Sequence, residues 1–271
     1  MKNGALVFLA VFVALGLSWC GFVLAPELQF GVAKETTILN SSDLYPVGRP
    51  GDATLGLQVY RANGCAACHT EQVRQSGVTC EVVLTDAGKN KAAVLKGIPI
   101  DIPPDLSKLP RTVLSGASKS FADTAVDQIS AAGGKSEIHI VATGPDIARG
   151  WGMRRSVAED YLYDEPVQLG SLRAGPDLSN AGVRAPDMNW QLVHLYAPPS
   201  EVKDSTMPPF RYLFEVRKIG GAPSPNALVF PKGFGPPAGF EVVPKPEAKE
   251  LAAYLLSLRA NVPLYSAPFT Q

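Results

Sequence analysis

Two cysteines and a histidine fall within one short stretch, Cys65-Ala-Ala-Cys68-His69. Side chains this close along a chain share one site, so the surrounding fold has to be built around that site. A zinc site needs four ligands, and zinc is disfavoured because no second tight pair of thiols or imidazoles follows. The other candidate ligands are single residues far along the chain, namely Cys80, His139 and His194.

A redox-active dithiol is the second interpretation of this stretch. Such a dithiol begins a helix that follows a strand, whereas "DATLGLQVYRANG" predicts a helix that ends before the cysteines, with Leu55, Val59 and Ala62 on one stripe. The third interpretation uses every residue of the stretch: the thiols of Cys65 and Cys68 add to the two vinyl groups of a haem, and His69 binds its iron. The stretch therefore predicts one covalently attached haem c.

The residue that binds the other side of the iron has to come from elsewhere in the chain. Met207 stands in "KDSTMPPFRYL", where Pro208 and Pro209 fix the backbone and prevent a helix, so a thioether there can be held rigidly. We therefore favour Met207 as the second iron ligand and keep His194 as the alternative. The remaining candidates, Met153, Met188 and His139, are more typical of packing or surface positions.

The run from Gly4 to Ala25 contains no charged residue and, at ~1.5 Å per residue, is long enough to cross a ~30 Å hydrocarbon layer. We predict an uncleaved membrane anchor; a cleaved signal peptide and an acylated Cys20 are the alternatives. Lys2 is the only charge before the run, which favours a cytoplasmic N-terminus. The expected location is a single-pass protein of a bacterial inner membrane, with its bulk in the periplasm.

The charges of the chain balance, with 25 basic and 25 acidic residues. No net field draws the whole protein to a polyanion, so a nucleic-acid partner is disfavoured.

Four blocks occur in an order that resembles a known family: "GCAACHTEQVR", "GSLRAGPDLSNAGVR", "WQLVHLYAP" and "STMPPFRYL". The chain resembles the membrane-anchored mono-haem cytochrome c subunit of cbb(3)-type cytochrome c oxidase over residues 1–77 and about 142–215. The resemblance implies a class I cytochrome c fold in which His69 and Met207 bind the iron. It also implies that the carbonyl of Pro176 accepts the second N–H of His69, and that Arg173 and Arg184 contact haem propionates or a partner subunit.

The same resemblance implies electron transfer, because the chain offers no catalytic pair of its own. Electrons would come from a second cytochrome c subunit or a soluble cytochrome c and pass to a haem-copper catalytic subunit. Three alternatives stay open: the mono-haem anchored subunit of a nitric oxide reductase, a membrane-tethered haem sensor, and a docking protein.

The end of the chain predicts a further helix, "KPEAKELAAYLLSLR", with Leu251, Tyr254, Leu255 and Leu258 on one face. In class I cytochromes c the first and last helices cross at a small residue against an aromatic one. The resemblance therefore suggests that Gly56 and Tyr60 meet Leu251 and Tyr254. Residues 216–245, rich in Gly and Pro, are predicted to form a long loop.

Residues 78–141 change character and interrupt the resemblance. They predict a strand with a core-facing Cys80, a capped helix after it, and later a helix ending at Gly133 before another strand. Through "VVLTDAGKNKAAVLKGI" and "AAGGKSEI" this segment resembles the C-terminal domain of the bacterial ribosomal stalk protein, which implies a β-α-α-β-α-β fold; its balanced charges identify no partner.

The expected fold class is mainly α, with an N-terminal transmembrane helix and a class I cytochrome c domain that carries an inserted small α+β domain. The expected layout is an anchor at 1–26, a linker at 27–51, a discontinuous cytochrome c domain at 52–77 and 142–262, the insert at 78–141, and a tail at 263–271.

Overall fold

The computed structural model describes residues 3–31, 34–89, 94–99 and 105–265. These residues form two compact units, one made of Met1–Gly48 with Val157–Val167 and the other of Arg49–Ser156 with Gln168–Gln271. Helices take up 37% of the described residues and strands 16%, so the expectation of a mainly α chain is not confirmed as stated.

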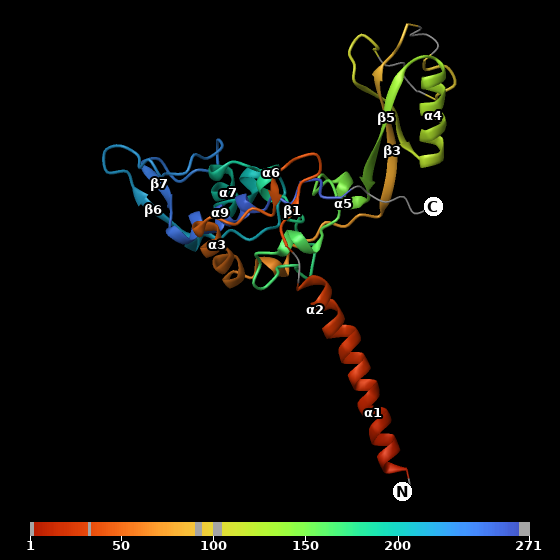
Figure 1. The fold of residues 1–271 in the computed structure, drawn as a ribbon. Helices are drawn as coiled ribbons and strands as arrows, with labels where there is room; N and C mark the ends of the chain where they lie inside the picture. Colours follow the sequence, from red (N-terminus) through yellow and green to blue (C-terminus); the bar gives the residue numbers. More distant parts are fainter. Residues whose placement is uncertain (1–2, 32–33, 90–93, 100–104, 266–271) are drawn as a thin grey trace. The chain divides into compact units, whose positions relative to one another are not determined.

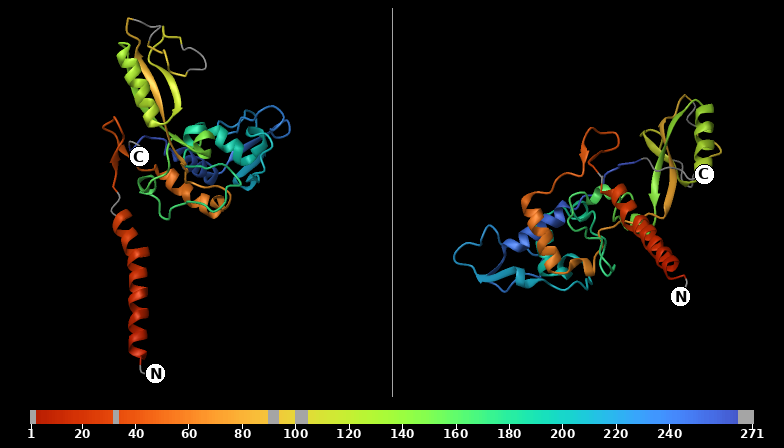
Figure 2. Two further views of the ribbon diagram at one scale, coloured as in Figure 1. Left: turned by 90° about the vertical axis from the view of Figure 1, so that its right-hand side faces the viewer. Right: turned by 60° about the horizontal axis from the view of Figure 1, so that its bottom comes forward.

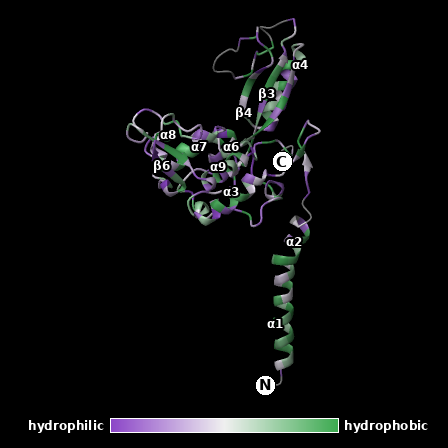
Figure 3. Ribbon diagram, turned by 90° about the vertical axis from the view of Figure 1, so that its left-hand side faces the viewer, coloured by the Kyte–Doolittle hydropathy of each residue, from purple (hydrophilic) through white to green (hydrophobic). Residues whose placement is uncertain are grey.

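The first unit begins with a long apolar helix. It comprises α1 (Gly4–Trp19), a π-helical stretch η1 (Cys20–Leu24) and α2 (Ala25–Phe30). The part from Gly4 to Gln29 is 26 residues long and none of its apolar window is buried within the protein. Figure 3 shows hydrophobic colour along nearly all of α1. This confirms the predicted apolar helix as a candidate membrane span, although the helix runs past the predicted limit of residue 26.

Two short strands lie in the stretch predicted as a linker, 27–51. β1 (Thr36–Thr37) pairs antiparallel with β2 (Leu44–Tyr45). The segment 157–167, which includes η3 (Ala158–Tyr161), joins this unit: Tyr45 Oη donates to Asp160 Oδ1 at 2.8 Å, and the hydroxyl of Tyr163 donates to Glu35. The stretch after the apolar helix is therefore held by a segment far along the sequence.

The second unit contains a helical region, and α3 (Gly51–Ala62) and α9 (Pro246–Ser257) pack together in its core. Between them in sequence lie the other elements of this region, which are η2 (Cys65–Ala67), α5 (Pro145–Ala148), α6 (Ala181–Arg184), α7 (Met188–Tyr196), α8 (Pro198–Glu201), η4 (Arg211–Leu213), β6 (Phe214–Lys218) and β7 (Phe240–Pro244). Figure 1 shows α3, α7 and α9 gathered in one region.

The crossing of α3 and α9 is the one the sequence suggested. The rings of Tyr60 and Tyr254 lie 5.1 Å apart between centroids, and both residues are fully buried. At Gly56 a Cβ would overlap the backbone of Glu250 and crowd the Cβ of Tyr254, so only glycine allows the helices to approach this closely. The predicted apolar face of α9 is also confirmed, since Leu251, Tyr254, Leu255 and Leu258 are all buried.

The predicted apolar stripe of α3 is wrong. Leu55 is 46% exposed and Ala62 is exposed, while Val59 is only partly buried. The contact with α9 is centred on Gly56, so the helix is rotated to bury the face that carries the glycine and not its aliphatic stripe. The buried residues of α3 are Ala53, Gly56, Leu57 and Tyr60.

The prediction of one long loop at 216–245 is also wrong. β6 and β7 form an antiparallel ladder from the pair Phe214–Pro244 to the pair Lys218–Phe240. Phe214 and Val242 are buried in the same core as α3 and α9. Only the connection between the two strands, 219–239, is irregular, and this is the part that holds most of the Gly and Pro residues.

The segment predicted as an insert has a sheet and a core of its own. β3 (Gly77–Asp86) lies between β4 (Arg111–Ala117) and β5 (Lys135–Thr143), and both pairings are antiparallel. α4 (Lys119–Ala131) is capped by Ser118, whose Oγ accepts the N–H of Phe121. Both views in Figure 2 show α4 (yellow-green) along one face of this sheet, and it buries Cys80, Val82 and Leu84 beneath it, as the sequence predicted for Cys80.

The described part of this segment departs from the β-α-α-β-α-β order. Its elements are β3, β4, α4 and β5, and Val94–Gly97 form turns where the first helix was expected to continue. The middle of that expected helix, 90–93, lies outside the described residues. The likeness to the ribosomal stalk domain therefore stays a prediction.

The two ends of this segment meet, as an insertion requires. Gly77 and Thr143 are direct partners in the β3–β5 ladder, and Ser76 N donates to Thr143 O at 2.8 Å. The chain thus leaves and re-enters the helical region at one place.

Candidate functional site

The Cys65–His69 stretch lies in a tight turn directly after α3. The N–H groups of Cys68 and His69 both donate to the carbonyl of Cys65, at 3.1 and 3.0 Å, so the three side chains leave one turn of backbone. Neither cysteine is in a disulfide; Cys65 is partly buried and Cys68 is exposed. Burial raises the pKa of the Cys65 thiol to about 11, so this group stays a protonated thiol at pH 7.

The imidazole of His69 is held in one orientation. Its Nδ1 lies 2.8 Å from the carbonyl oxygen of Pro176, the contact expected from the family resemblance. Since a carbonyl can only accept, Nδ1 carries the hydrogen and Nε2 keeps its lone pair. Burial lowers the pKa of His69, opposed by the Pro176 contact, so the ring is neutral at pH 7.

Gly175 lets the 173–178 block come this close to the ring. Its N–H donates to Cys68 O at 2.9 Å, and a Cβ at this position would overlap the imidazole of His69. The glycine before Pro176 is therefore required by close approach.

Asp177 fastens the same block to the stretch after His69. The carboxylate is fully buried, and Oδ2 accepts the hydroxyl of Thr70 at 2.6 Å and the N–H of Gln72 at 2.7 Å. Oδ1 accepts the N–H of Ser179 at 3.0 Å. Sequence reasoning assigned Asp177 no role, although an Asp two residues before a Ser is a recognisable turn signal.

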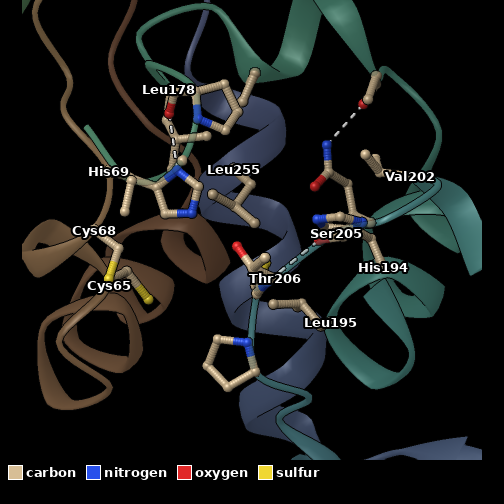
Figure 4. A pocket seen from close by; sticks show the side chains of 18 of the residues that line it. Cys65, Cys68, His69, Leu178, His194, Leu195, Val202, Ser205, Thr206 and Leu255 are labelled. Carbon is tan, nitrogen blue, oxygen red and sulfur yellow. Dashed lines mark hydrogen bonds between the residues drawn. The ribbon is translucent and has the colours of Figure 1, made fainter. Parts of the chain in front are cut away.

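Beside His69 lies a cavity of about 540 Å³, within the range of cofactor sites. Figure 4 shows Cys65, Cys68 and His69 on one side of it, with Leu195, Thr206 and His194 on the opposite side. The apolar lining residues include Leu178, Ala181, Leu195, Val202, Leu251 and Leu255.

Met207 also lines this cavity, and its loop is tied to α7. Phe210 N donates to Leu195 O at 2.8 Å, Ser205 N donates to Val202 O at 3.1 Å, and Met207 N donates to Ser205 Oγ at 3.4 Å. The thioether is partly buried against the core that α3 and α9 form. These contacts hold the loop independently of any cofactor.

The other candidate ligands separate clearly by position. His194, on α7, lines the cavity with Met207, whereas Met153 and Met188 are exposed and are not among its lining residues. His139 is on β5, with Nε2 3.5 Å from Glu137. Of the described residues proposed as the second iron ligand, only Met207 and His194 line the cavity.

The two candidate arginines differ in their position relative to the cavity. Arg184 lines the cavity and donates to the carbonyls of Asp177 and Trp151, at 2.5 and 3.3 Å; burial lowers its pKa, opposed by the charge of Asp177. Arg173 is not among the lining residues, and its Nη1 pairs with the carboxylate of Asp146 at 2.6 Å. Arg184 is therefore placed to bind an anionic group in the cavity, whereas the ion pair of Arg173 with Asp146 stabilises the fold.

A buried carboxylate behind the site was not expected from the sequence. Glu71 accepts the hydroxyl of Tyr254 at 2.9 and 3.0 Å, and burial raises its pKa to about 7. Glu71 lies two residues after His69, so its bond with Tyr254 ties this stretch to α9. The only signal for it in the sequence is its closeness to the cysteine–histidine stretch.

These residues fit the haem that the cysteine–histidine stretch predicts. Two free thiols stand beside a neutral imidazole whose lone pair is not used by a hydrogen bond, at the edge of a largely apolar cavity of suitable volume. A thioether and a second imidazole line the same cavity, together with an arginine for an anionic substituent.

Residues 142–222 match the family model described as cytochrome C oxidase, mono-heme subunit/FixO. The matched part is less than a third of the chain; it includes Pro176, Arg184, His194 and Met207 but not the cysteine–histidine stretch or the apolar helix. A search of curated proteins gave no match. The matched part supplies many of the residues that line the cavity, including Pro176, His194 and Met207.

Proposed function

We propose that this chain is the membrane-anchored mono-haem c subunit of a cbb(3)-type terminal oxidase. It would take electrons from a second cytochrome c subunit or a soluble cytochrome c and pass them to the haem-copper catalytic subunit in aerobic respiration. The observation that carries the proposal is that His69, beside Cys65 and Cys68, lines the same cavity as Met207, which lies in the part that matches the mono-haem oxidase subunit, residues 142–222.

In this proposal Cys65 and Cys68 hold the haem through thioether bonds, and His69 and Met207 bind its iron. The haem supplies reversible one-electron transfer. Two protein ligands leave no open position for oxygen, which favours an electron carrier over an oxygen-binding site. Pro176 sets the orientation and basicity of His69 through its carbonyl contact.

Arg184 is proposed to bind a haem propionate. Arg184 lines the cavity, and within the described part of the chain its guanidinium donates to two backbone carbonyls and to no carboxylate. A cation at the edge of the cavity with no bonded anion gains a charge-assisted hydrogen bond when an anionic group enters the cavity. Arg173 is no longer a candidate for this role in our proposal because its charge is matched by Asp146.

The apolar helix is proposed to anchor the chain in a bacterial inner membrane, with the N-terminus in the cytoplasm and the haem in the periplasm. The support is its length of 26 residues without burial and the single lysine before it. Covalent attachment of haem to two thiols is a chemistry of exported proteins, which agrees with this orientation.

A nitric oxide reductase subunit is the alternative that shares the anchor and the haem. Purification of the intact membrane complex through a tag on this chain decides between them. Our proposal predicts a haem-copper subunit that reduces oxygen in the recovered complex. A complex that reduces nitric oxide in preference, or recovery of this chain without any haem-copper subunit, would contradict it.

A further inference from the structure

Of the groups that line the cavity, His194 has no role in the site as described so far. It comes from α7, the helix to which the Met207 loop is bonded, because Phe210 N donates to the carbonyl of Leu195, the residue after His194. His194 and Met207 thus leave neighbouring backbones and line one cavity. Figure 4 places the imidazole of His194 across the cavity from that of His69.

The ring of His194 is held rigidly. It stacks on Trp190, one helical turn earlier, with 4.9 Å between ring centroids and 8° between planes. Its Nδ1 is buried and makes no hydrogen bond with any residue that the structure describes. A buried polar atom without a partner is costly.

His194 is also in the right chemical form to bind a metal. Burial lowers its pKa to about 4, the nearby His69 adds to this, and a weaker backbone contact with Pro198 opposes it. The ring is therefore neutral at pH 7, and a nitrogen lone pair is free without the loss of a proton.

We infer that His194 is a reserve iron ligand, which replaces Met207 whenever the thioether leaves the iron. The inference rests on the proposed function. In the exchange one sulfur–iron bond breaks and one imidazole nitrogen–iron bond forms, and neither an electron nor a proton is transferred. The site would stay six-coordinate, its potential would fall because a thioether favours Fe(II) more than imidazole does, and small gases would be kept off.

The test uses the full-length, haem-loaded chain in detergent and compares Met207→Ala with Met207→Ala/His194→Leu. We expect ferric Met207→Ala to lose the Met–iron absorption band, to stay low-spin by electron paramagnetic resonance with the signature of two imidazole ligands, and not to bind carbon monoxide when reduced. The double variant should become high-spin and bind carbon monoxide.

Lys203 supplies the matched control, since it lines the same cavity and carries a nitrogen that could bind iron. Met207→Ala/Lys203→Ala should behave as Met207→Ala does. If the alanine variant folds poorly, Met207→Leu removes the sulfur at nearly constant volume and is compared in the same way.

A high-spin, carbon monoxide-binding Met207→Ala variant overturns the inference and leaves the proposed function standing. A double variant with His194→Leu that stays low-spin also overturns it. An unchanged Met–iron band in Met207→Ala overturns both, because Met207 would then not be the ligand.

Discussion

Gly56 of α3 lies against the backbone of Glu250 and the Cβ of Tyr254 on α9, with no room for a side chain between the helices. Gly56→Ala should therefore push the two helices apart and lower the free energy of unfolding by ~1–3 kcal/mol, the usual cost of overpacking. Denaturant unfolding of the haem-loaded chain, followed by haem absorption, measures the effect.

Gly51→Ala is the control for this change, because Gly51 is in the same helix and a Cβ there meets nothing within 4 Å. It should alter stability by less than ~0.5 kcal/mol. Equal effects at the two glycines would show that close approach at Gly56 is not what the crossing requires.

Gly175→Ala tests how tightly the ring of His69 is positioned. A Cβ at Gly175 would overlap the imidazole, so the ring must move or tilt, at a cost of ~1–3 kcal/mol. We expect a weakened Met–iron band and a lower yield of haem-loaded chain. Gly235→Ala, whose Cβ would make an ordinary 3.7 Å contact with Phe230, should leave both unchanged. A normal spectrum in Gly175→Ala would contradict the close contact.

The pair Asp146–Arg173 should be worth much more than an exposed pair. Asp146→Asn removes the closer of the two carboxylates beside the largely buried Arg173 and leaves only Asp177, 3.8 Å away, so a loss of ~1.5–3 kcal/mol in unfolding free energy is expected. Asp123→Asn, which breaks the exposed pair with Lys119, should cost less than ~0.5 kcal/mol. Tryptophan fluorescence during denaturation follows both, since Trp151 lies under Arg173. Similar losses in the two variants would contradict the expected difference between the buried and the exposed ion pair.

The Asp146 effect should also depend on pH. Burial alone would raise the pKa of this carboxyl, but the bond from Arg173 and the N–H of Arg74 lower it overall. The folded pKa is thus below the unfolded value of ~3.9, so the contribution is complete above about pH 4 and is lost as the pH falls through the folded pKa. The gap between wild type and Asp146→Asn should therefore be full at pH 7 and shrink below about pH 4; a gap that grows on acidification would contradict this sign.

Much of this architecture could be predicted because particular residues leave one physical option. The uncharged run from Gly4 to Ala25 predicts a spanning helix, and the Leu and Tyr spacing of α9 predicts its buried face. The contact between His69 and Pro176 was expected from the family blocks and is present. Positions with strong periodicity or a fixed chemistry were thus accessible to sequence reasoning.

The errors arose where a long-range contact decides the local structure. β6 and β7 are short and are separated by a Gly/Pro-rich connection, so neither strand has a clear pattern without the other. The buried face of α3 follows Gly56 because α9 approaches there, which its own aliphatic stripe does not reveal. The roles of Asp177 and Glu71 were missed for the same reason: their partners are about a hundred or more residues away.

Excision of residues 79–141, with the ends joined by a short Gly/Ser linker, tests the division of the second unit. The two hydrophobic cores share no residue, and Gly77 pairs directly with Thr143, so a short linker can close the gap. Haem attachment and the Met–iron band should be retained, as measured by haem staining and absorption. A folded excised protein that attaches no haem would mean that this segment belongs to the haem site.

Haem retention under denaturing conditions tests the central claim most directly. The full-length chain, expressed with a haem-attachment system and treated with acid acetone, should keep one haem per chain, because thioether bonds from Cys65 and Cys68 survive unfolding. Its pyridine spectrum should be that of a haem with both vinyl groups saturated, and Cys65→Ala/Cys68→Ala should retain none. Haem that is extracted from the wild-type chain, or a chain that carries no haem at all, would contradict the account.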